Sequence, residues 1–560
     1  MYTPITPSTL RLQDGRELHW KGFFTGHRVL SDDEVAGYAY RLLHATPSTV
    51  TVLAAQELSC YRASDGSTPP SLLLHSATGT IKCFEGDVED LALGRSPRDV
   101  GTFCEARSVY LGTSTDLTVG RTEPWSDAAR LRGVPAVNIG KQEYYYLSHA
   151  LLEAAGEHAS GTITPLTEVV AWLREHPGAV IRPYVLDVET QIFLLWLRRE
   201  AGLPRLWIDA NKPAVDARWN RKSHIHPIVA RARELDVKGL PVDELLIEEQ
   251  HESEAFVQLR LEVPVLPGYT IPRAGISQTQ FVAEVLEAAS LLRRRYGIST
   301  GALKPSQAGE GARIVGNIDL DADDSLTILA SEAYVHGDDY LLEAWTEFLL
   351  FTADEARHPV VPSGHFRYGQ VAEGLTLQSL NRYCWNGNVF VDEAAWDKLG
   401  LPMSIYWTIR NAMESIRRAF VSSHSPEDGC YEGLVIGGID FAVGRVGGHF
   451  GDRTLVGAID FNLSSHGAEY MRAFREEART VGSFEQYVAT RVFRPTVSAT
   501  LEGLETIVRL EVGSSGLAKI IACVPDRWGM VATTGGDLPE AMKRVQDMVN
   551  VLADRGLAAS

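Results

Sequence analysis

The segment Leu455-Val-Gly-Ala-Ile-Asp460-Phe461-Asn462 is a run of β-forming residues that ends in oxygen-bearing side chains. A similar run, Gly437-Gly438-Ile439-Asp440-Phe441-Ala442-Val443, precedes it. Asp440 and Asp460 are 20 residues apart, and the intervening glycines predict a hairpin with an elaborated turn (Gly444, Gly447, Gly448 and Gly451). The hairpin places Asp440 on the strand next to Asp460 and Asn462, and the period of two puts Asp460 and Asn462 on one face.

These three side chains form a candidate metal site. Mg²⁺ prefers oxygen ligands and takes a few carboxylates together with waters and substrate phosphates. We therefore predict that Asp440, Asp460 and Asn462 hold Mg²⁺, with Mn²⁺ as a substitute at the same oxygens. The alternative is that the two aspartates only cap turns at the ends of strands, as Asp often does.

Two upstream segments carry further candidate residues. In the first, Gly301-Ala-Leu-Lys304-Pro305-Ser306-Gln307-Ala308-Gly309-Glu310-Gly311, an apolar strand ends in Lys-Pro and a glycine-containing loop follows. Glycines let backbone N–H groups approach a phosphate, and a lysine adds positive charge. The segment 301–311 matches neither the P-loop pattern GxxxxGK[ST] nor the dinucleotide-binding pattern GxGxxG. The alternative is therefore that it forms an ordinary turn. The second, Tyr340-Leu-Leu-Glu343-Ala344-Trp345-Thr346-Glu347-Phe348, is an apolar strand interrupted by an acid.

Between about residues 124 and 209, short apolar runs alternate with helical patterns, which predicts a parallel α/β layer. The best-marked helix of the chain begins at Ser277, where Ser277-Gln-Thr-Gln280 fits the capping-box pattern. Phe281, Val285, Ala288 and Leu292 recur on one face, and Gly297 ends the helix. The β-branched run at 48–55 predicts a strand near the N-terminus.

Charge and composition restrict the class of protein. The chain has 560 residues, with 53 Lys+Arg against 72 Asp+Glu, giving a formal charge of −19. This balance disfavours a nucleic-acid partner, which requires a basic surface. No apolar run approaches the roughly 20 residues of a membrane span, and the first residues lack a signal-peptide pattern. We therefore expect a cytoplasmic protein without a membrane partner.

The order of the four motifs resembles that of the ATP-grasp superfamily of carboxylate–amine ligases, which includes D-alanine:D-alanine ligase and biotin carboxylase. The motifs are Lys-Pro with its small loop, strand-Glu-x-Trp, Gly-x-Asp-Phe and Asp-Phe-Asn. The resemblance covers roughly residues 230–480, and the part from about 124 to 230 looks like the domain that precedes the grasp fold. In overall layout the chain looks most like the pheganomycin-type peptide ligases of bacterial natural-product pathways.

The resemblance implies roles for individual residues. Lys304 would contact the nucleotide, and the loop from Gln307 through Gly309 to Gly311 would cover the triphosphate. Glu343 and the backbone of Ala344 and Trp345 would recognise adenine, and Glu347 would reach the ribose. Lys222 would be a second lysine of the nucleotide pocket. The three metal ligands would hold Mg²⁺ between the β- and γ-phosphates of ATP.

The sequence departs from the family pattern at three places. Asp460 stands where Glu is usual, Gly438 stands where several ligases have Arg, and Leu463-Ser464-Ser465-His466 replaces Pro-Arg. The donors that stabilise the reacting groups must then come from elsewhere. Lys304, Arg445 and His466 are the candidate catalytic residues, with Arg453 and Ser465 as further donors.

The predicted fold class is mixed α+β: an ATP-grasp fold preceded by an open α/β domain. The expected parts are 1–123 as an N-terminal extension, 124–230 as the preceding domain, 231–480 as the ATP-grasp domain and 481–560 as a small β-β-β-α unit. In that unit we expect strands at 506–511, 518–524 and 529–533 and a helix at 539–553. The unit would close over the substrate or form a homodimer.

The predicted function is ATP-dependent joining of a small-molecule carboxylate to an amine, both amino acids or peptides, through an acyl phosphate. Two alternatives stay open. The chain would be a nucleotide-binding scaffold that has lost its chemistry, or an ATP-grasp kinase or carboxylase.

Overall fold

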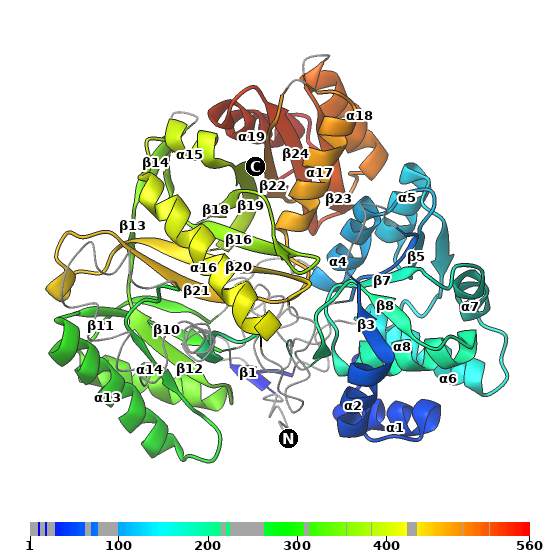
Figure 1. Cartoon of the computed structure of the whole chain (residues 1–560), viewed down its shortest axis with the longest axis horizontal. Helices are drawn as coiled ribbons and strands as arrows, with labels where there is room; N and C mark the ends of the chain where they lie inside the picture. Colours follow the sequence, from blue (N-terminus) through cyan, green and yellow to red (C-terminus); the bar gives the residue numbers. More distant parts are fainter. Residues whose placement is uncertain are drawn as a thin grey trace.

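A computed structural model describes residues 9–11, 17–19, 28–61, 69–76, 99–213, 215, 220–224, 263–306, 313–353, 356–381, 384–422, 434–483, 485–513 and 516–559. Three main sheets organise these residues (Figure 1). The N-terminal strands β1 (Thr9–Arg11) and β2 (Glu17–His19) form a separate antiparallel pair.

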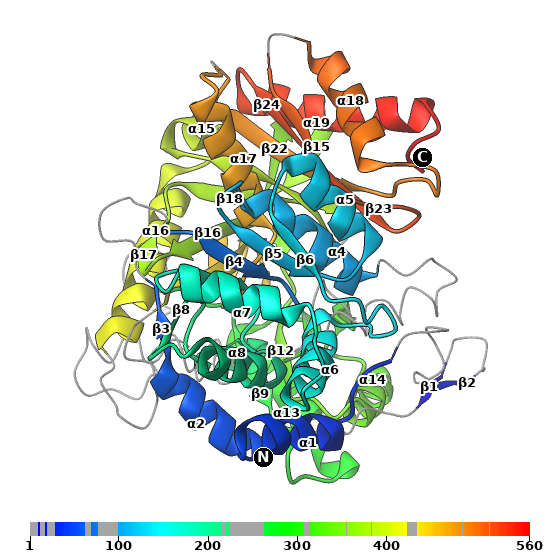
Figure 2. The same cartoon turned by 90° about the vertical axis from the view of Figure 1, so that its right-hand side faces the viewer.

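The first main sheet is the parallel α/β layer that the sequence predicts. Its six strands have the order β3-β8-β7-β4-β5-β6, and every pairing is parallel. The strands are β3 (Leu58–Cys60), β4 (Ser71–Leu74), β5 (Leu117–Gly120), β6 (Ala136–Asn138), β7 (Val180–Pro183) and β8 (Leu206–Ile208). The helices are α1 (Asp32–Leu43), α2 (Pro47–Glu57), α4 (Val100–Ser108), α5 (Glu123–Arg132), α6 (Leu147–Ala159), α7 (Leu166–Glu175) and α8 (Val188–Ala201), with a short η2 (Val109–Leu111) (Figure 2).

This layer differs from the expectation in two respects. Its sheet takes strands from both sides of the boundary expected at 123/124, so strands β3 to β8 belong to one sheet. The stretch at 48–55, expected as a strand, lies in helix α2. Thr46 accepts a hydrogen bond from the Thr49 N–H at the start of this helix, and Pro47 occupies its first turn. These signals outweigh the β-propensity of the branched residues.

The second sheet has the order β11-β10-β12-β9 and is antiparallel. Helix α13 begins after Ser277 with the predicted capping box and ends at Gly297, and its four predicted core residues are buried. The elements are β9 (Gly268–Ile271), β10 (Thr300–Pro305), β11 (Val315–Asp319), β12 (Tyr340–Ala344), α13 (Gln278–Tyr296) and α14 (Asp323–Val335).

The third sheet has ten strands, with β13-β20-β16-β18-β19-β22-β24-β23 as its main path and β17 and β21 paired to its side. Its strands are β13 (Glu347–Phe348), β16 (Pro362–Arg367), β17 (Gln370–Val371), β18 (Leu375–Asn381), β19 (Cys384–Val391), β20 (Ile436–Arg445), β21 (Leu455–Asn462), β22 (Tyr487–Phe493), β23 (Ala518–Val524) and β24 (Trp528–Gly535). The hairpin of β14 (Leu350–Ala353) and β15 (Ala356–Pro359) stands apart. The helices are α15 (Glu393–Lys398), α16 (Met403–Ser422), α17 (Ala468–Thr480), α18 (Leu501–Val512) and α19 (Leu538–Asp554), with a short η5 (Gly448–Phe450).

The C-terminal part extends this large sheet, because β22, β24 and β23 continue it past the boundary expected at 480/481. The strand expected at 506–511 lies in helix α18. Thr500 accepts a hydrogen bond from the Gly503 N–H, and Leu501, Leu504 and Val508 are buried at helical spacing. That periodic burial overrides the local preference for strand.

Helix α17 joins the parallel layer to the large sheet. Tyr470, Met471 and Phe474 of α17 pack in one buried cluster with residues of β19, β22, β23 and β24 and with Phe103 of α4. On strand β16, Gly364 faces helix α16, since a Cβ at this glycine would meet Met413. The neighbouring residues of β16, Ser363 and His365, therefore point to the opposite face of the sheet, where the candidate metal ligands also lie.

Candidate functional site

The predicted hairpin is formed by β20 and β21. Asp440 lies directly opposite Asp460, and Asn462 lies opposite Gly438. Ile459 is an extra residue in β21, because Ala458 pairs with Phe441 and Asp460 with Asp440. The bulge precedes both predicted ligands on this strand, so Asp460 and Asn462 share a face with Asp440.

Two side chains donate hydrogen bonds to Asp440, and a third supports one of these donors. The Ser363 hydroxyl donates to Oδ1 of Asp440 over 2.5 Å, and Nδ2 of Asn462 donates to its Oδ2 over 3.1 Å. Nε2 of Gln378 donates to the Ser363 oxygen over 3.1 Å. Burial, together with the nearby Asp460 carboxylate, raises the pKa of Asp440 to about 6.

Lys222 reaches this carboxylate pair from another part of the chain. Its Nζ lies 2.9 Å from Oδ2 of Asp460, and its side chain is buried. The backbone of the short helix η3 (Lys222–His224) fixes its position, since the Lys222 N–H donates to the Ser306 carbonyl over 3.0 Å. Ser306 follows β10, so this contact joins Lys222 to the four-stranded sheet.

Lys304 and Glu343 form an ion pair between β10 and β12. Both residues are buried. Burial raises the pKa of Glu343, while Lys304 and then Lys222 oppose that shift. The two lysines, Glu343 and the Asp440–Asp460 pair thus form one charged cluster between the four-stranded and ten-stranded sheets.

The cluster fits a magnesium ion bound jointly with phosphates. Two carboxylates at adjacent strand positions repel each other, and a divalent cation relieves this repulsion. Asn462 uses its amide nitrogen on Asp440, which leaves its amide oxygen for a metal. Within the described ranges, no group of three or more His, Cys, Asp and Glu side chains could hold a metal. Two carboxylates and one amide oxygen are few protein ligands, and such a set is typical of Mg²⁺ held together with a nucleotide.

The predicted adenine-binding hinge is partly occupied by the sheet itself. The Ala344 N–H donates to the Pro267 carbonyl over 2.8 Å, and the Trp345 N–H donates to the Thr300 carbonyl over 3.0 Å. Adenine recognition here would have to use carbonyl oxygens. Gln307, Gly309 and Gly311, the predicted cover of the triphosphate, lie outside the described residues.

The structure does not bring Arg445 to the carboxylate pair. Arg445 lies at the far end of β20, opposite Glu347 of β13. Five residues of strand separate it from Asp440, a span of about 16 Å. Its nearest carboxylate partner is Asp452, at 3.5 Å, and both side chains are exposed. Arg453 donates to the carbonyls of Phe450 and His449 in the same turn region.

His466 contacts His365, which was not predicted from the sequence and lies on the strand next to Asp440. Its ring stacks on His365 with centroids 4.4 Å apart, and His365 of β16 lies opposite Gly438. A Cβ at Gly438 would stand 2.8 Å from Nδ1 of His365, so the glycine makes room for this ring. Burial and then Arg472, Arg367 and Arg107 lower the pKa of His466 to about 3.

Two asparagines, which also were not predicted from the sequence, hold the start of β20 and the end of β21 against the parallel layer. Asn211, three residues after β8, donates to the Ile436 and Leu463 carbonyls, both over 2.7 Å, and accepts from the Val435 N–H. Asn220 accepts from the Leu463 N–H over 3.0 Å. The alternation Ser363-Gly-His365-Phe-Arg367 was the available signal for β16. Nothing in the sequence marks the two asparagines.

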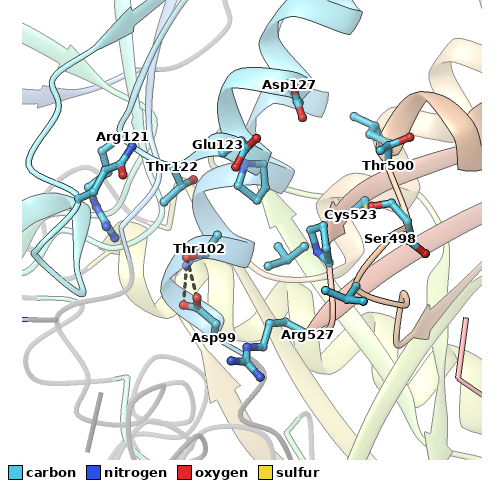
Figure 3. Close-up of a pocket in the computed structure, with 17 residues that line it drawn as sticks. Asp99, Thr102, Arg121, Thr122, Glu123, Asp127, Ser498, Thr500, Cys523 and Arg527 are labelled. Carbon is cyan, nitrogen blue, oxygen red and sulfur yellow. Dashed lines mark hydrogen bonds between the residues drawn. The ribbon is translucent and has the colours of Figure 1, made fainter. Parts of the chain in front are cut away.

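A separate cavity of about 580 Å³ lies between α5, the start of α18 and β23 (Figure 3). Its rim includes Asp99, which accepts hydrogen bonds from Thr102, and Arg527 (Figure 3). None of the residues that the sequence predicts for the site lines this cavity.

Across the described residues, no helix combines the length and apolar character of a membrane span.

No protein-family model and no curated protein matches the chain. It is similar to several solved structures. An ADP complex of N5-carboxyaminoimidazole ribonucleotide synthetase matches at 10% identity and a TM-score of 0.43, over 87% of this chain and 98% of that one. The biotin carboxylase domain of Hydrogenobacter thermophilus 2-oxoglutarate carboxylase, with MgADP and bicarbonate, matches at 12% and 0.45, over 86% and 90%. D-alanyl-alanine synthetase A from Vibrio cholerae matches at 10% and 0.37, over 73% and 94%.

The described strands and helices form the mixed α+β fold class expected from the sequence.

Proposed function

We propose that this protein is an ATP-dependent ligase that joins a carboxylate to an amine. The observation that carries the proposal is the charged cluster between two sheets, in which Asp440, Asp460 and Asn462 meet Lys222 and the Lys304–Glu343 pair. Clustered carboxylates need a cation, and buried lysines suit phosphate oxygens. Mg·ATP supplies both charges.

The reaction needs no protein nucleophile. The γ-phosphoryl group of ATP passes to a carboxylate oxygen of the first substrate, giving an acyl phosphate and ADP. The amine nitrogen of the second substrate then attacks the acyl carbon. The new C–N bond forms as the C–O bond to phosphate breaks, and the amine proton leaves to solvent with phosphate as the other product.

The residues of the chain would position groups and balance charge during these steps. Bound magnesium would neutralise charge on the transferring phosphoryl group. Asp440, Asp460 and Asn462 would hold the metal. Lys222 and Lys304 would contact phosphate oxygens, and Ser363 and Gln378 would fix the orientation of Asp440. A peptide-type product and an acyl-phosphate route are part of this proposal.

The test is amine-dependent phosphate release from Mg·ATP with an amino-acid mixture, followed by mass spectrometry of the products. We expect an amide, ADP and phosphate in equal amounts, and Asp460→Ala and Asn462→Ala should abolish turnover. The matched control Asp526→Ala, at an exposed turn, should retain it. A phosphorylated or carboxylated product would indicate a kinase or a carboxylase instead. ATP binding without any product would indicate a scaffold.

A further inference from the structure

A group of arginines gathers where the carboxyl ends of the parallel strands meet the turn after β21. Arg182 belongs to β7, Arg107 to α4 and Arg367 to β16. His75 lies directly after β4. Burial lowers its pKa well below the usual value, and the positive charges of Arg107, Arg182 and Arg367 lower this pKa further. Open α/β sheets bind ligands at this edge. We call these arginines and their carboxylate partners, Asp209 and Glu469, the arginine junction.

The junction carries more positive than negative charge. Asp209 accepts from both Nη atoms of Arg367, at 2.7 and 2.9 Å, and lies 3.2 Å from Nε of Arg182. Glu469 lies 3.4 Å from Arg367. Three guanidinium groups thus face two carboxylates, which leaves one positive charge in excess.

Of the three arginines of the junction, Arg107 has no carboxylate partner in the part of the chain that the structure describes. It is 5% exposed and lies over the rings of Phe103, Tyr184 and Tyr470 at 4.9 to 5.1 Å. Its Nη2 donates to the Cys104 sulfur over 3.3 Å, and its Nε has no hydrogen-bond partner in the described part of the chain. Aromatic faces offset part of the cost of a buried cation, but a buried charge is stabilised most by an opposite charge.

Strand β16 connects the junction to the charged cluster. Ser363, His365 and Arg367 alternate on β16 and share the face that carries Asp440. Four residues of strand place Arg367 about 13 Å from the level of Asp440, and arginine side chains span part of this distance. Arg367 and Arg182 keep 26% and 15% of their side chains exposed, so both side chains are partly accessible from solvent.

We propose that the arginine junction binds the free carboxylate of the amine substrate, so that this substrate is an amino acid or a peptide. The inference rests on the proposed ligase function. The reacting carboxylate of the other substrate must lie at the charged cluster, about 13 Å along β16 from the junction. An amine-bearing end of that first substrate would be repelled by the excess positive charge. An attacking amino acid instead places its carboxylate at the arginines and its nitrogen toward the charged cluster.

The same positive charge would help the attack. Neighbouring cations disfavour an ammonium ion, so they increase the fraction of free amine that can act as a nucleophile. Asp209 and Glu469 orient the arginines in this arrangement, because each accepts from Arg367. Ser465 donates to Glu469, and its N–H donates to the Tyr184 carbonyl over 3.0 Å, which fixes the turn after β21 against the junction.

The experiment is a competition in one reaction with the full chain and Mg·ATP. The twenty amino acids and their carboxamides are supplied at equal concentration, and high-resolution mass spectrometry separates products that end in a carboxylate from those that end in an amide. We expect about a ten-fold or larger excess of carboxylate-ended products, as a charge-assisted contact would give. Equal amounts of the two would overturn the junction while leaving the ligase function intact.

Arg182→Lys and Arg367→Lys test the junction directly. Each should reduce the preference for free carboxylates several-fold while Mg·ADP still binds, which shows that the variant is folded. Arg544→Lys is the matched control, because Arg544, at 16% exposed, is about as buried as Arg182 and pairs with Glu485 in the C-terminal part. An unchanged preference in both test variants would overturn the proposal.

A binding measurement separates failure of the junction from failure of the proposed function. If the wild-type protein forms no amide, calorimetric titration with the amino-acid mixture and then with the carboxamide mixture still tests the junction. Binding of the free acids that weakens in Arg367→Lys would support the anion site without the ligase. Equal binding of acids and carboxamides, or binding of neither, would refute it.

Discussion

Nζ of Lys222 lies 2.9 Å from Oδ2 of Asp460, so a buried ammonium group forms an ion pair with one of the carboxylates predicted to hold the metal. The two residues come from segments more than two hundred positions apart in the sequence. The contact implies that Lys222 and a metal ion compete for Asp460 when no nucleotide is bound. A nucleotide phosphate would then give Lys222 another partner.

Lys222→Met should therefore change metal and nucleotide binding in opposite directions. Without nucleotide, Mn²⁺ should bind about ten-fold more tightly, which corresponds to about 1.4 kcal/mol. Mg·ADP should bind more weakly, because a phosphate contact is lost. Calorimetry or electron paramagnetic resonance of Mn²⁺ measures the first effect. Lys519→Met, which removes a partly exposed pair with Glu477, is the control; weaker Mn²⁺ binding to Lys222→Met would contradict the competition.

The raised pKa of Asp440 predicts a pH dependence of metal binding. With a pKa of about 6, the Asp440 carboxyl is largely protonated at pH 5 and ionised at pH 7.5. Mn²⁺ affinity should fall by about ten-fold as the pH is lowered from 7.5 to 5, since a metal ligand must be deprotonated. Asp440→Asn should bind Mn²⁺ weakly at both values. A wild-type affinity that does not change over this range would remove Asp440 from the site.

Asp440 should also reduce stability at neutral pH in the metal-free protein. The unfolded chain releases this proton near pH 3.8 and the folded chain near pH 6, so the stabilising contribution is full below pH 3.8 and is lost as the pH rises through 6. The difference amounts to on the order of 3 kcal/mol. Asp440→Asn should raise the melting temperature at pH 7.5 and leave it nearly unchanged at pH 4. A lower melting temperature at pH 7.5 would show that the hydrogen bond from Ser363 outweighs the charge.

The Lys304–Glu343 pair should be costly to break on one side. Lys304→Met leaves the buried Glu343 carboxylate without its cation, and we expect a loss of about 3–5 kcal/mol in urea unfolding. Adding Glu343→Gln should restore a large part of this stability, because no unpaired charge remains. Both variants should bind Mg·ADP more weakly than the wild type. If the double variant is no more stable than Lys304→Met, the pair is not the source of the loss.

Gly438 should resist even a small side chain. Its Cβ would stand 2.8 Å from Nδ1 of His365, whose buried ring stacks on His466. Gly438→Ala should therefore cost about 1–3 kcal/mol in urea unfolding. Gly37→Ala is the matched control, because nothing lies within 4 Å of a Cβ there and Gly37 is inside helix α1. That change should be neutral or stabilising by about 0.5–1 kcal/mol.

Local patterns in the sequence were sufficient for many elements. The capping box at Ser277 and the glycine at 297 set both ends of α13, and the β20–β21 hairpin follows from its strand composition and its glycines. Two local predictions were wrong. The stretches at 48–55 and 506–511 are helical, because a capping threonine and periodic burial decided their structure. The domain boundaries at 123/124 and 480/481 fall within sheets, since strand pairing over long sequence distances leaves no local signal.

The sequence by itself determined which residues carry charge at the candidate site and which strands hold them, because the side-chain period of a strand is a local property. Only the tertiary structure decided what those residues meet. It paired Lys222 with Asp460, placed His365 beside Gly438, moved Arg445 away from the carboxylates and gathered three arginines around His75. The physical reason is that burial and charge interactions depend on distances in space, and these distances are set by how whole sheets pack against one another.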